Sequence, residues 1–366
     1  MGKKYGIKIY FNLHYAPTNN FGYHGYSMWK LNDNTNNMTN RNKVREMWEA
    51  LAERYSNEDT ILGWGLMNEP VPYYQDGKTL DEMLQPWVNT AKLFRDAIRK
   101  YDNNHILFVE PSEMLNNNGK YISYTSNRRV LTRCVDLLYT QVFKKDNNYC
   151  FEYHWYSLWS FSSKGVSGTT FQPLTENTLK ARSDYLKTIS DYIKKNSTPF
   201  LGEFGVSLQT MPCKGYEDKL TGIDFVNTTL DFCKEENVSF NYHQYRDNIF
   251  GLHSSSYKIM DNQDLYDIFK ARLFSLYDEK LNNNEEVKTP NNINDEETKT
   301  NKAPSEIEDN EITTETVKVS KENSNTSTSN SSYGLPKTSG FDRANMIEIS
   351  ALIIIILALV GVKIRH

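Results

Sequence analysis

Residues 61–70 read ILGWGLMNEP, an apolar run that ends at a carboxylic acid, Glu69. Residues 199–205, PFLGEFG, repeat the arrangement with Glu203. Between them, residues 150–156, CFEYHWY, carry a histidine and a tyrosine at the end of a third run. Short apolar runs bounded by turn residues are typical of buried strands. The sequence therefore places two carboxylates, an imidazole and a phenol at strand ends.

Strand-like runs alternate with helical patterns over most of the chain. The predicted strands span residues 7–13, 61–67, 106–109, 150–154, 200–204 and 238–242. The predicted helices span residues 41–55, 84–101, 178–196, 222–237 and 265–277. This alternation indicates right-handed βαβ units on a parallel sheet, which is an α/β fold. Because the polar groups gather at the carboxyl ends of strands, we expect a TIM (β/α)8 barrel.

The number of strands suggests that the barrel is incomplete. A TIM barrel has eight strands, and the sequence provides six. Residues 1–6, MGKKYG, read as the tail of a helix running into a strand, and no signal segment precedes them. We therefore expect residues 1–280 to form an N-terminally incomplete barrel containing the third to eighth units.

The two strand-end glutamates suggest a chemistry. Hydrolysis of a glycosidic bond needs one carboxylic acid to protonate the departing oxygen and one carboxylate to attack or stabilise the sugar carbon. Glu69 and Glu203 provide this pair. The reaction needs no metal and no organic cofactor, so we expect none. Taken singly, either glutamate is equally well explained as a solvated strand-end carboxylate.

Five motifs in order resemble glycoside hydrolase family 5, the cellulase-like family of retaining (β/α)8 enzymes. They are residues 12–17 (NLHYAP), residues 48–55 in the helix before the second strand, residues 68–70 (NEP), His154-x-Tyr156, and Glu203. The resemblance extends over about residues 3–277. It implies an endo-acting enzyme for β-linked glycans.

The resemblance also implies roles for single residues. Glu69 is then the general acid/base and Glu203 the nucleophile, and the negative charge of Glu203 is expected to raise the pKa of Glu69. Asn68 is expected to bind the sugar 2-hydroxyl, and Tyr156 to donate a hydrogen bond to Glu203. His154 is expected to line the site near Glu69, and His14 to contact the sugar at the cleavage site.

Aromatic side chains after the strands are candidates for stacking on sugar rings. They are Phe21, Tyr23, Tyr26, Trp29, Tyr73, Tyr74, Trp159 and Phe161, and about half are expected to serve in packing instead. Among them Trp29 is our leading candidate for substrate binding. His243 stands at about the place where the family usually brings a tryptophan under the cleavage-site sugar, so the resemblance implies that it binds substrate, and the preferred glycan is left open. The arginine that the family's second strand supplies beside the nucleophile has no counterpart here.

The C-terminal part differs in composition. Residues 281–334 are rich in Asn, Glu, Thr, Ser and Lys, and we expect a disordered linker. Residues 335–340, LPKTSG, precede an aliphatic segment, 349–362, and a basic end. This arrangement resembles the cell-wall sorting signal of Gram-positive surface proteins, with Ser339 in place of glycine.

The sorting signal implies recognition by a sortase through Leu335, Pro336 and Thr338, cleavage after the threonine, and attachment to peptidoglycan. The alternative is a plain membrane anchor, although the aliphatic segment is shorter than the roughly 20 residues of a typical spanning helix. Both interpretations place residues 1–280 outside the cell, at the wall or membrane.

Charge and cysteine content add limits. The formal net charge of −4, with no basic block in the barrel region, argues against nucleic-acid binding. The four cysteines fit no metal or redox motif, so free thiols and a disulfide both remain open. Two other functions also remain open: an inactive carbohydrate-binding or adhesive surface protein, and a glycosidase of host glycolipids or glycoproteins.

Overall fold

The computed structural model describes residues 2–17, 23–118, 120–122, 129–156, 159–165, 170–211, 219–245, 249–252 and 263–282. Residues 283–334 of the predicted linker, the sorting motif with Leu335, Pro336 and Thr338, and the aliphatic segment lie outside these residues. Phe21 and Cys213 also lie outside them. Residues 281 and 282, predicted as the start of the linker, instead end a helix. Among the described residues, no helix combines the length and the apolar character needed to cross a membrane.

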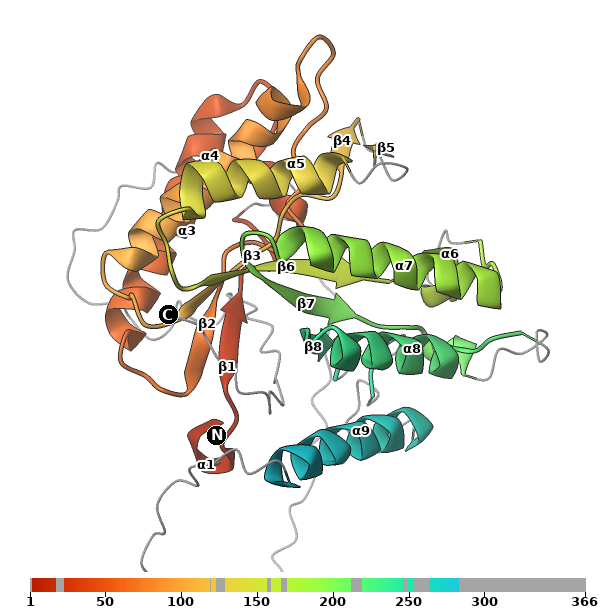
Figure 1. Ribbon diagram of the computed structural model, residues 1–366. Helices are drawn as coiled ribbons and strands as arrows, with labels where there is room; N and C mark the ends of the chain where they lie inside the picture. The colour runs from red at the N-terminus through yellow and green to blue at the C-terminus, as the bar shows by residue number, and fades with distance from the viewer. Residues whose placement is uncertain are drawn as a thin grey trace, which may run out of the picture. The chain divides into compact units, whose positions relative to one another are not determined.

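Six parallel strands form one curled sheet (Figure 1). In sheet order they are β1 (Ile9–Asn12), β2 (Ile61–Gly65), β3 (Ile106–Val109), β6 (Tyr149–Trp155), β7 (Thr198–Phe204) and β8 (Ser239–Tyr242). Each strand pairs with the next one along the chain, which is the order of a TIM barrel. All six strands lie where the sequence predicts them, so the prediction of six units of such a barrel is confirmed.

Helices separate the strands. The longer ones are α3 (Asn34–Tyr55), α4 (Leu80–Arg99), α5 (Arg129–Leu138), α7 (Glu176–Ile193), α8 (Gly222–Glu235) and α9 (Gln263–Asn282). The short ones are α1 (Gly2–Tyr5), α2 (Tyr26–Trp29), α6 (Trp159–Ser162), the 3-10 turns η1 (Tyr23–Gly25) and η3 (Leu208–Thr210), and the π-helical turn η2 (Tyr139–Phe143). A hairpin of β4 (Leu115–Asn117) and β5 (Lys120–Ile122) follows β3. Helix α5 and the hairpin were not predicted.

The sheet has two differently packed faces, because successive residues of a strand point to opposite sides. Leu107, Val109, Phe151 and Leu201 belong to the main core, which includes the buried residues of the helices. Tyr10, Phe108, Cys150 and Phe200 form a separate cluster, the inner cluster, with ring centroids of Tyr10 and Phe108 4.5 Å apart. Residues that alternate in step with Cys150, namely Glu152 and His154, therefore also lie on the inner face.

An extra residue in β7 sets the direction of Glu203. The register of β7 shifts between Leu201 and Phe204 against β8, and both of these residues pack in the main core. Gly202 and Glu203 between them are therefore both available to the inner face, as expected at a β-bulge. A Cβ on Gly202 would lie 1.8 Å from Glu152 Oε1, so only glycine leaves room for that carboxylate.

Three of the four cysteines are described. Cys134, Cys150 and Cys233 are buried free thiols. Burial raises the pKa of the Cys134 thiol to about 12, which makes it a packing residue rather than a nucleophile.

Candidate active site

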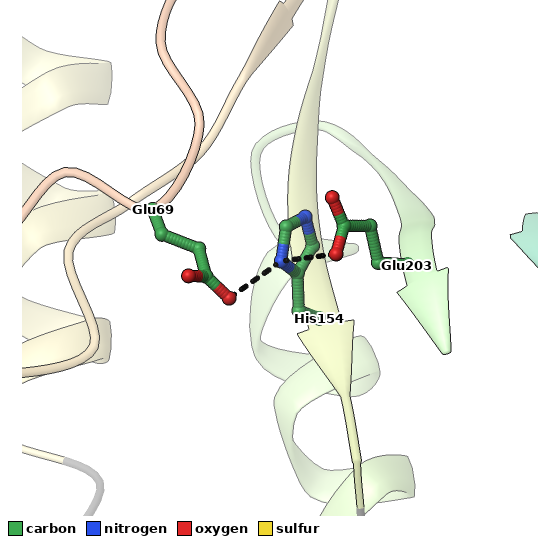
Figure 2. A group of neighbouring side chains, drawn as sticks. All are labelled: Glu69, His154 and Glu203. Carbon is green, nitrogen blue, oxygen red and sulfur yellow. Dashed lines mark hydrogen bonds and ion pairs between the residues drawn. The ribbon is translucent and has the colours of Figure 1, made fainter. Parts of the chain in front are cut away.

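Glu69 and Glu203 face each other from the ends of β2 and β7. Figure 2 shows the imidazole of His154 between their carboxylates. Its Nδ1 lies 3.1 Å from Glu69 Oε1 and 3.6 Å from Glu203 Oε2. One ligand atom from each of the three residues lies within 4.8 Å of the other two, so the two carboxylates are no farther apart than that. The predicted carboxylate pair is therefore brought together.

Glu203 is held by two aromatic neighbours. The hydroxyl of Tyr156, just beyond β6, donates to Glu203 Oε2 at 2.7 Å. His243, just beyond β8, brings Nδ1 to 3.6 Å from the same oxygen. Glu203 itself is only 5 % exposed. The expected contact of Tyr156 is present, and His243 lies beside the carboxylate as well.

Glu69 occupies a tight turn after β2. Asn68 N–H donates to Leu13 O at 2.9 Å, which ties the turn to the end of β1. Glu69 has φ of 40°, a left-handed backbone that side-chain-bearing residues rarely adopt. His24 Nδ1 lies 2.9 Å from Glu69 O and 3.6 Å from its Oε2. The carboxyl group is the more open of the pair, with 28 % of its side chain exposed.

Two further glutamates lie on the inner face and were not predicted as site residues. Glu110, directly after β3, accepts a hydrogen bond from the Glu69 backbone N–H at Oε2, 2.6 Å away. Its Oε1 lies 3.5 Å from His154 Nδ1. Glu152 lies 3.5 Å from His154 Nε2 and accepts a hydrogen bond from the Tyr10 hydroxyl at 3.2 Å. His154 is thus surrounded by four carboxylates.

This geometry agrees with a family match. The model of the family described as Cellulase (glycosyl hydrolase family 5) matches residues 2–249. The chain belongs to glycosyl hydrolase family 5.

Known relatives of this family 5 chain share part of their length with it. Endoglucanase B of Acetivibrio thermocellus is 31 % identical over 125 residues, which are 32 % of this chain and 21 % of the relative. A β-xylosidase of Phanerodontia chrysosporium is 30 % identical over 114 residues, 29 % of this chain and 21 % of the relative. The matched segment thus spans about a fifth of the length of each curated relative.

A solved structure supports the fold. Cel5A of Thermotoga maritima, solved in mutant form with cellobiose, superposes with a TM-score of 0.52. The match covers 74 % of this chain and 73 % of that one at 17 % identity. At this identity the likeness concerns the fold, which is that of family 5.

The four carboxylates determine the protonation of His154. Burial lowers the pKa of the imidazole, but the charges of Glu110 and Glu203, the Glu152 carboxylate 3.5 Å from Nε2 and the hydrogen bond to Glu69 raise it well above its ordinary value. The four carboxylates therefore favour the protonated form of the ring.

His154 reverses the pKa shift expected at Glu69. Burial raises the pKa of Glu69, but the hydrogen bond and charge of His154, with the charges of His24 and His14, lower it to about 2. The prediction of a raised pKa is therefore wrong for this structure, because an imidazole rather than the Glu203 carboxylate is the neighbour that dominates. At Glu110, burial and the charges of Glu69 and Glu152 raise the pKa well above the ordinary value.

Of the other predicted site residues, Asn68 and His14 lie near the two glutamates, whereas Trp29 lies in the core. Asn68 is buried, and its Oδ1 accepts no hydrogen bond from the residues that the structure describes. His14 lies half-buried after β1; burial lowers its pKa, while Glu203 and Glu69 oppose that shift, so it lies in the field of both glutamates. Trp29 does not line the site: it is 4 % exposed, donates its indole N–H to Val71 O and packs on Trp87. The substrate-binding prediction for Trp29 is corrected, because its ring is used in the core.

The remaining aromatic candidates differ in exposure. Trp159 is 52 % exposed, and its ring centroid lies 5.8 Å from that of Tyr156. Phe161 is buried and belongs to the core. Tyr26 and Tyr73 are half-buried, with centroids 5.7 Å apart. Tyr74 is also half-buried, and the side chain of Tyr23 lies outside the described part of the chain.

Glu69, His154 and Glu203 are also close enough to share a cation. The hydrogen bond between His154 and Glu69, and that between Tyr156 and Glu203, already account for their approach.

Proposed function

We propose that this chain carries the active site of a retaining endo-glycosidase that hydrolyses β-linked glycans, with Glu69 as acid/base and Glu203 as nucleophile. The supporting observation is the close approach of the two carboxylates: one oxygen of Glu69 lies within 4.8 Å of one oxygen of Glu203. Retaining glycosidases place these groups about 5–5.5 Å apart, whereas inverting enzymes leave about 6.5–9.5 Å for a water molecule.

In the first step a carboxylate oxygen of Glu203 attacks the anomeric carbon, and Glu69 donates a proton to the departing glycosidic oxygen. This forms a glycosyl–enzyme ester and releases the alcohol. In the second step Glu69 removes a proton from water, whose oxygen attacks the same carbon and releases Glu203. Both glutamates return to their starting protonation, so the balance is hydrolysis.

His154 supplies a way to protonate Glu69 before the first step. The 3.1 Å contact with His154 lowers the pKa of Glu69 and so favours its ionised form. A glycosidic oxygen that enters between the carboxylates displaces water and strengthens the effect of burial, which raises the pKa of Glu69. A proton then moves along the hydrogen bond from Nδ1 to the carboxylate, and after the second step the proton that Glu69 took from water returns to Nδ1.

The other polar residues are assigned supporting roles. Tyr156 orients Glu203 through its 2.7 Å hydrogen bond. Asn68 offers its buried amide to the sugar 2-hydroxyl. His14 and His243 contact the sugar at the cleavage site.

We also propose that the protein acts outside the cell, attached by a sortase to the peptidoglycan of a Gram-positive bacterium. The support is the sequence alone: Leu335, Pro336 and Thr338, followed by the aliphatic segment and the basic end.

Hydrolysis of a panel of β-linked oligosaccharides, followed by proton NMR of the anomeric signals, tests the proposal. We expect cleavage of at least one glycan to a product that first appears as the β anomer, and none with Glu69→Gln or Glu203→Gln. A first product of α configuration contradicts a retaining mechanism. Binding of a glycan by the wild type without any turnover favours the carbohydrate-binding or adhesive protein instead, and cleavage confined to glycolipid or glycoprotein glycans identifies the substrate class.

A further inference from the structure

Glu110 is a buried glutamate to which the reaction above assigns no role. It follows β3 directly and is 2 % exposed. Its backbone carbonyl accepts a hydrogen bond from the indole N–H of Trp87 in α4 at 3.0 Å, and Trp87 is fully buried. This hydrogen bond ties the backbone of Glu110 to the main core and so fixes the point from which its side chain extends.

The two carboxyl oxygens of Glu110 have different partners. Oε2 accepts the backbone N–H of Glu69 at 2.6 Å. This bond is made to a residue with φ of 40°, a conformation that needs support where a Cβ is present. Oε1 faces His154 Nδ1 at 3.5 Å, the same nitrogen that contacts Glu69 Oε1.

We infer that Glu110 is a positioning residue for the acid/base: one oxygen holds the Glu69 backbone, and the other holds the ring that contacts the Glu69 carboxyl. In this role Glu110 acts through Glu69 and His154, the two residues that its carboxyl oxygens contact. The inference rests on the proposed role of Glu69. It adds a reason why Glu69 adopts an uncommon backbone conformation at this point in the chain.

The charged and titratable groups around Glu110 come from three sides. Tyr10 lies on β1, Glu69 follows β2, and Glu152 and His154 lie on β6. Of these residues, Glu69 alone donates a backbone N–H to the Glu110 carboxyl in the described structure. Glu152 is the matched comparison, because it is an equally buried glutamate facing the opposite nitrogen of the same imidazole.

The kinetic test compares two leaving groups in the full chain. For Glu110→Ala we expect kcat on an unactivated β-glycoside to fall about 100-fold, the scale of a small misplacement of a catalytic group. The loss on a dinitrophenyl glycoside should be less than about tenfold, because that leaving group needs no proton. KM should change less than about threefold. Equal losses on both substrates would indicate a structural role and overturn the inference.

The Glu110→Gln variant separates position from charge. Its amide oxygen can still accept the Glu69 N–H, so we expect it to recover most of the activity lost in Glu110→Ala. Glu110→Asp keeps the charge but shortens the reach by one methylene, so it should resemble the alanine variant. The aspartate variant also serves as the test if the alanine variant does not fold. An inactive Glu110→Gln beside an active Glu110→Asp contradicts the inference.

A second measurement does not depend on turnover. The Glu69 amide proton, bound to a buried carboxyl, should resonate downfield and exchange slowly in ¹⁵N-resolved NMR of the wild type. It should move upfield in Glu110→Ala and Glu110→Asp, and stay in Glu110→Gln and Glu152→Gln. An unchanged signal in Glu110→Ala overturns the inference. Lack of turnover by the wild type with the shift still present overturns the proposed function and leaves the hydrogen bond established.

Discussion

The residues that the sequence identified at the site share one property: each stands at the end of a strand. Glu69, His154, Tyr156 and Glu203 could be predicted because strand order in a parallel sheet brings such ends together. His24 could not, because it comes from a short turn with positive φ and carries no periodic signal. The substrate-binding prediction for Trp29 was wrong because the sequence does not distinguish an aromatic ring that packs in the core from one that binds sugar.

The acid role of Glu69 predicts a dependence on the leaving group. In Glu69→Ala, kcat/KM on unactivated glycosides should fall by about 10²–10⁴, the usual contribution of general acid catalysis. Substrates with activated leaving groups should lose far less in the glycosylation step. Steady-state kinetics on a series of aryl glycosides checks this. The control is Glu46→Ala, which changes an exposed glutamate on the surface. A uniform loss across the series would count against the assignment.

At the scale of elements, prediction succeeded where periodicity is strong. The six strands and five helices were found, and the helix tail at residues 2–5 was recognised, but α3 begins at Asn34 rather than residue 41 and α9 ends at Asn282 rather than residue 277. Helix α5 was missed although Val130, Leu131, Cys134, Val135 and Leu138 form a buried stripe at helical spacing. Gly202 is the one sign of the β7 bulge in the sequence. Glycine is required at this position because a Cβ would clash with Glu152, which is distant in sequence.

Helix α4 offers a test of how these elements are stabilised. Thr79 and Glu82 form a capping box, in which Thr79 Oγ1 accepts the Glu82 N–H and Glu82 Oε2 accepts the Thr79 N–H. We expect Thr79→Ala to lower the free energy of unfolding by about 1 kcal/mol, and Thr79→Ser to preserve most of it. Urea denaturation at neutral pH measures both. Equal stability of the alanine variant and the wild type would show that the cap contributes nothing here.

The same capping box predicts how the stability of the fold changes with pH. Hydrogen bonds from Thr79 and Lys78 lower the pKa of Glu82 to about 2. The carboxylate therefore stabilises the fold above its ordinary pKa of 4.5, and the contribution is lost as pH falls toward 2.

At the scale of the molecule, the fold class followed from the order of strands and helices, and the structure supports it. Within the described residues, β1 and β8 each pair on one side only, whereas the strands of a closed barrel pair on both. The packing of the sheet and the closure of a barrel depend on contacts between segments that are distant in sequence, so the pattern within one strand or helix does not predict them. The C-terminal signal is a different case: its function depends on recognition by another protein, and it remains a sequence-based prediction.

Surface display is tested with a reporter fused to residues 335–366 in a host with a sortase. We expect covalent attachment to the cell wall through Thr338, at a reduced rate because Ser339 replaces glycine. Thr338→Ala should abolish attachment and serves as the control. Recovery of the reporter wholly in the detergent-soluble membrane fraction, with residues 349–366 still present, would support the plain membrane anchor.

The central claim is that Glu203 attacks the sugar while Glu69 supplies the proton. A 2-deoxy-2-fluoro β-glycoside with an activated leaving group tests it directly, because the fluorine slows both steps and the good leaving group lets the glycosyl–enzyme accumulate. Peptide mass spectrometry of the inactivated protein should find one sugar on the peptide that contains Glu203, and none in Glu203→Gln. A label on Glu69, or sustained turnover by Glu203→Gln, would contradict the account.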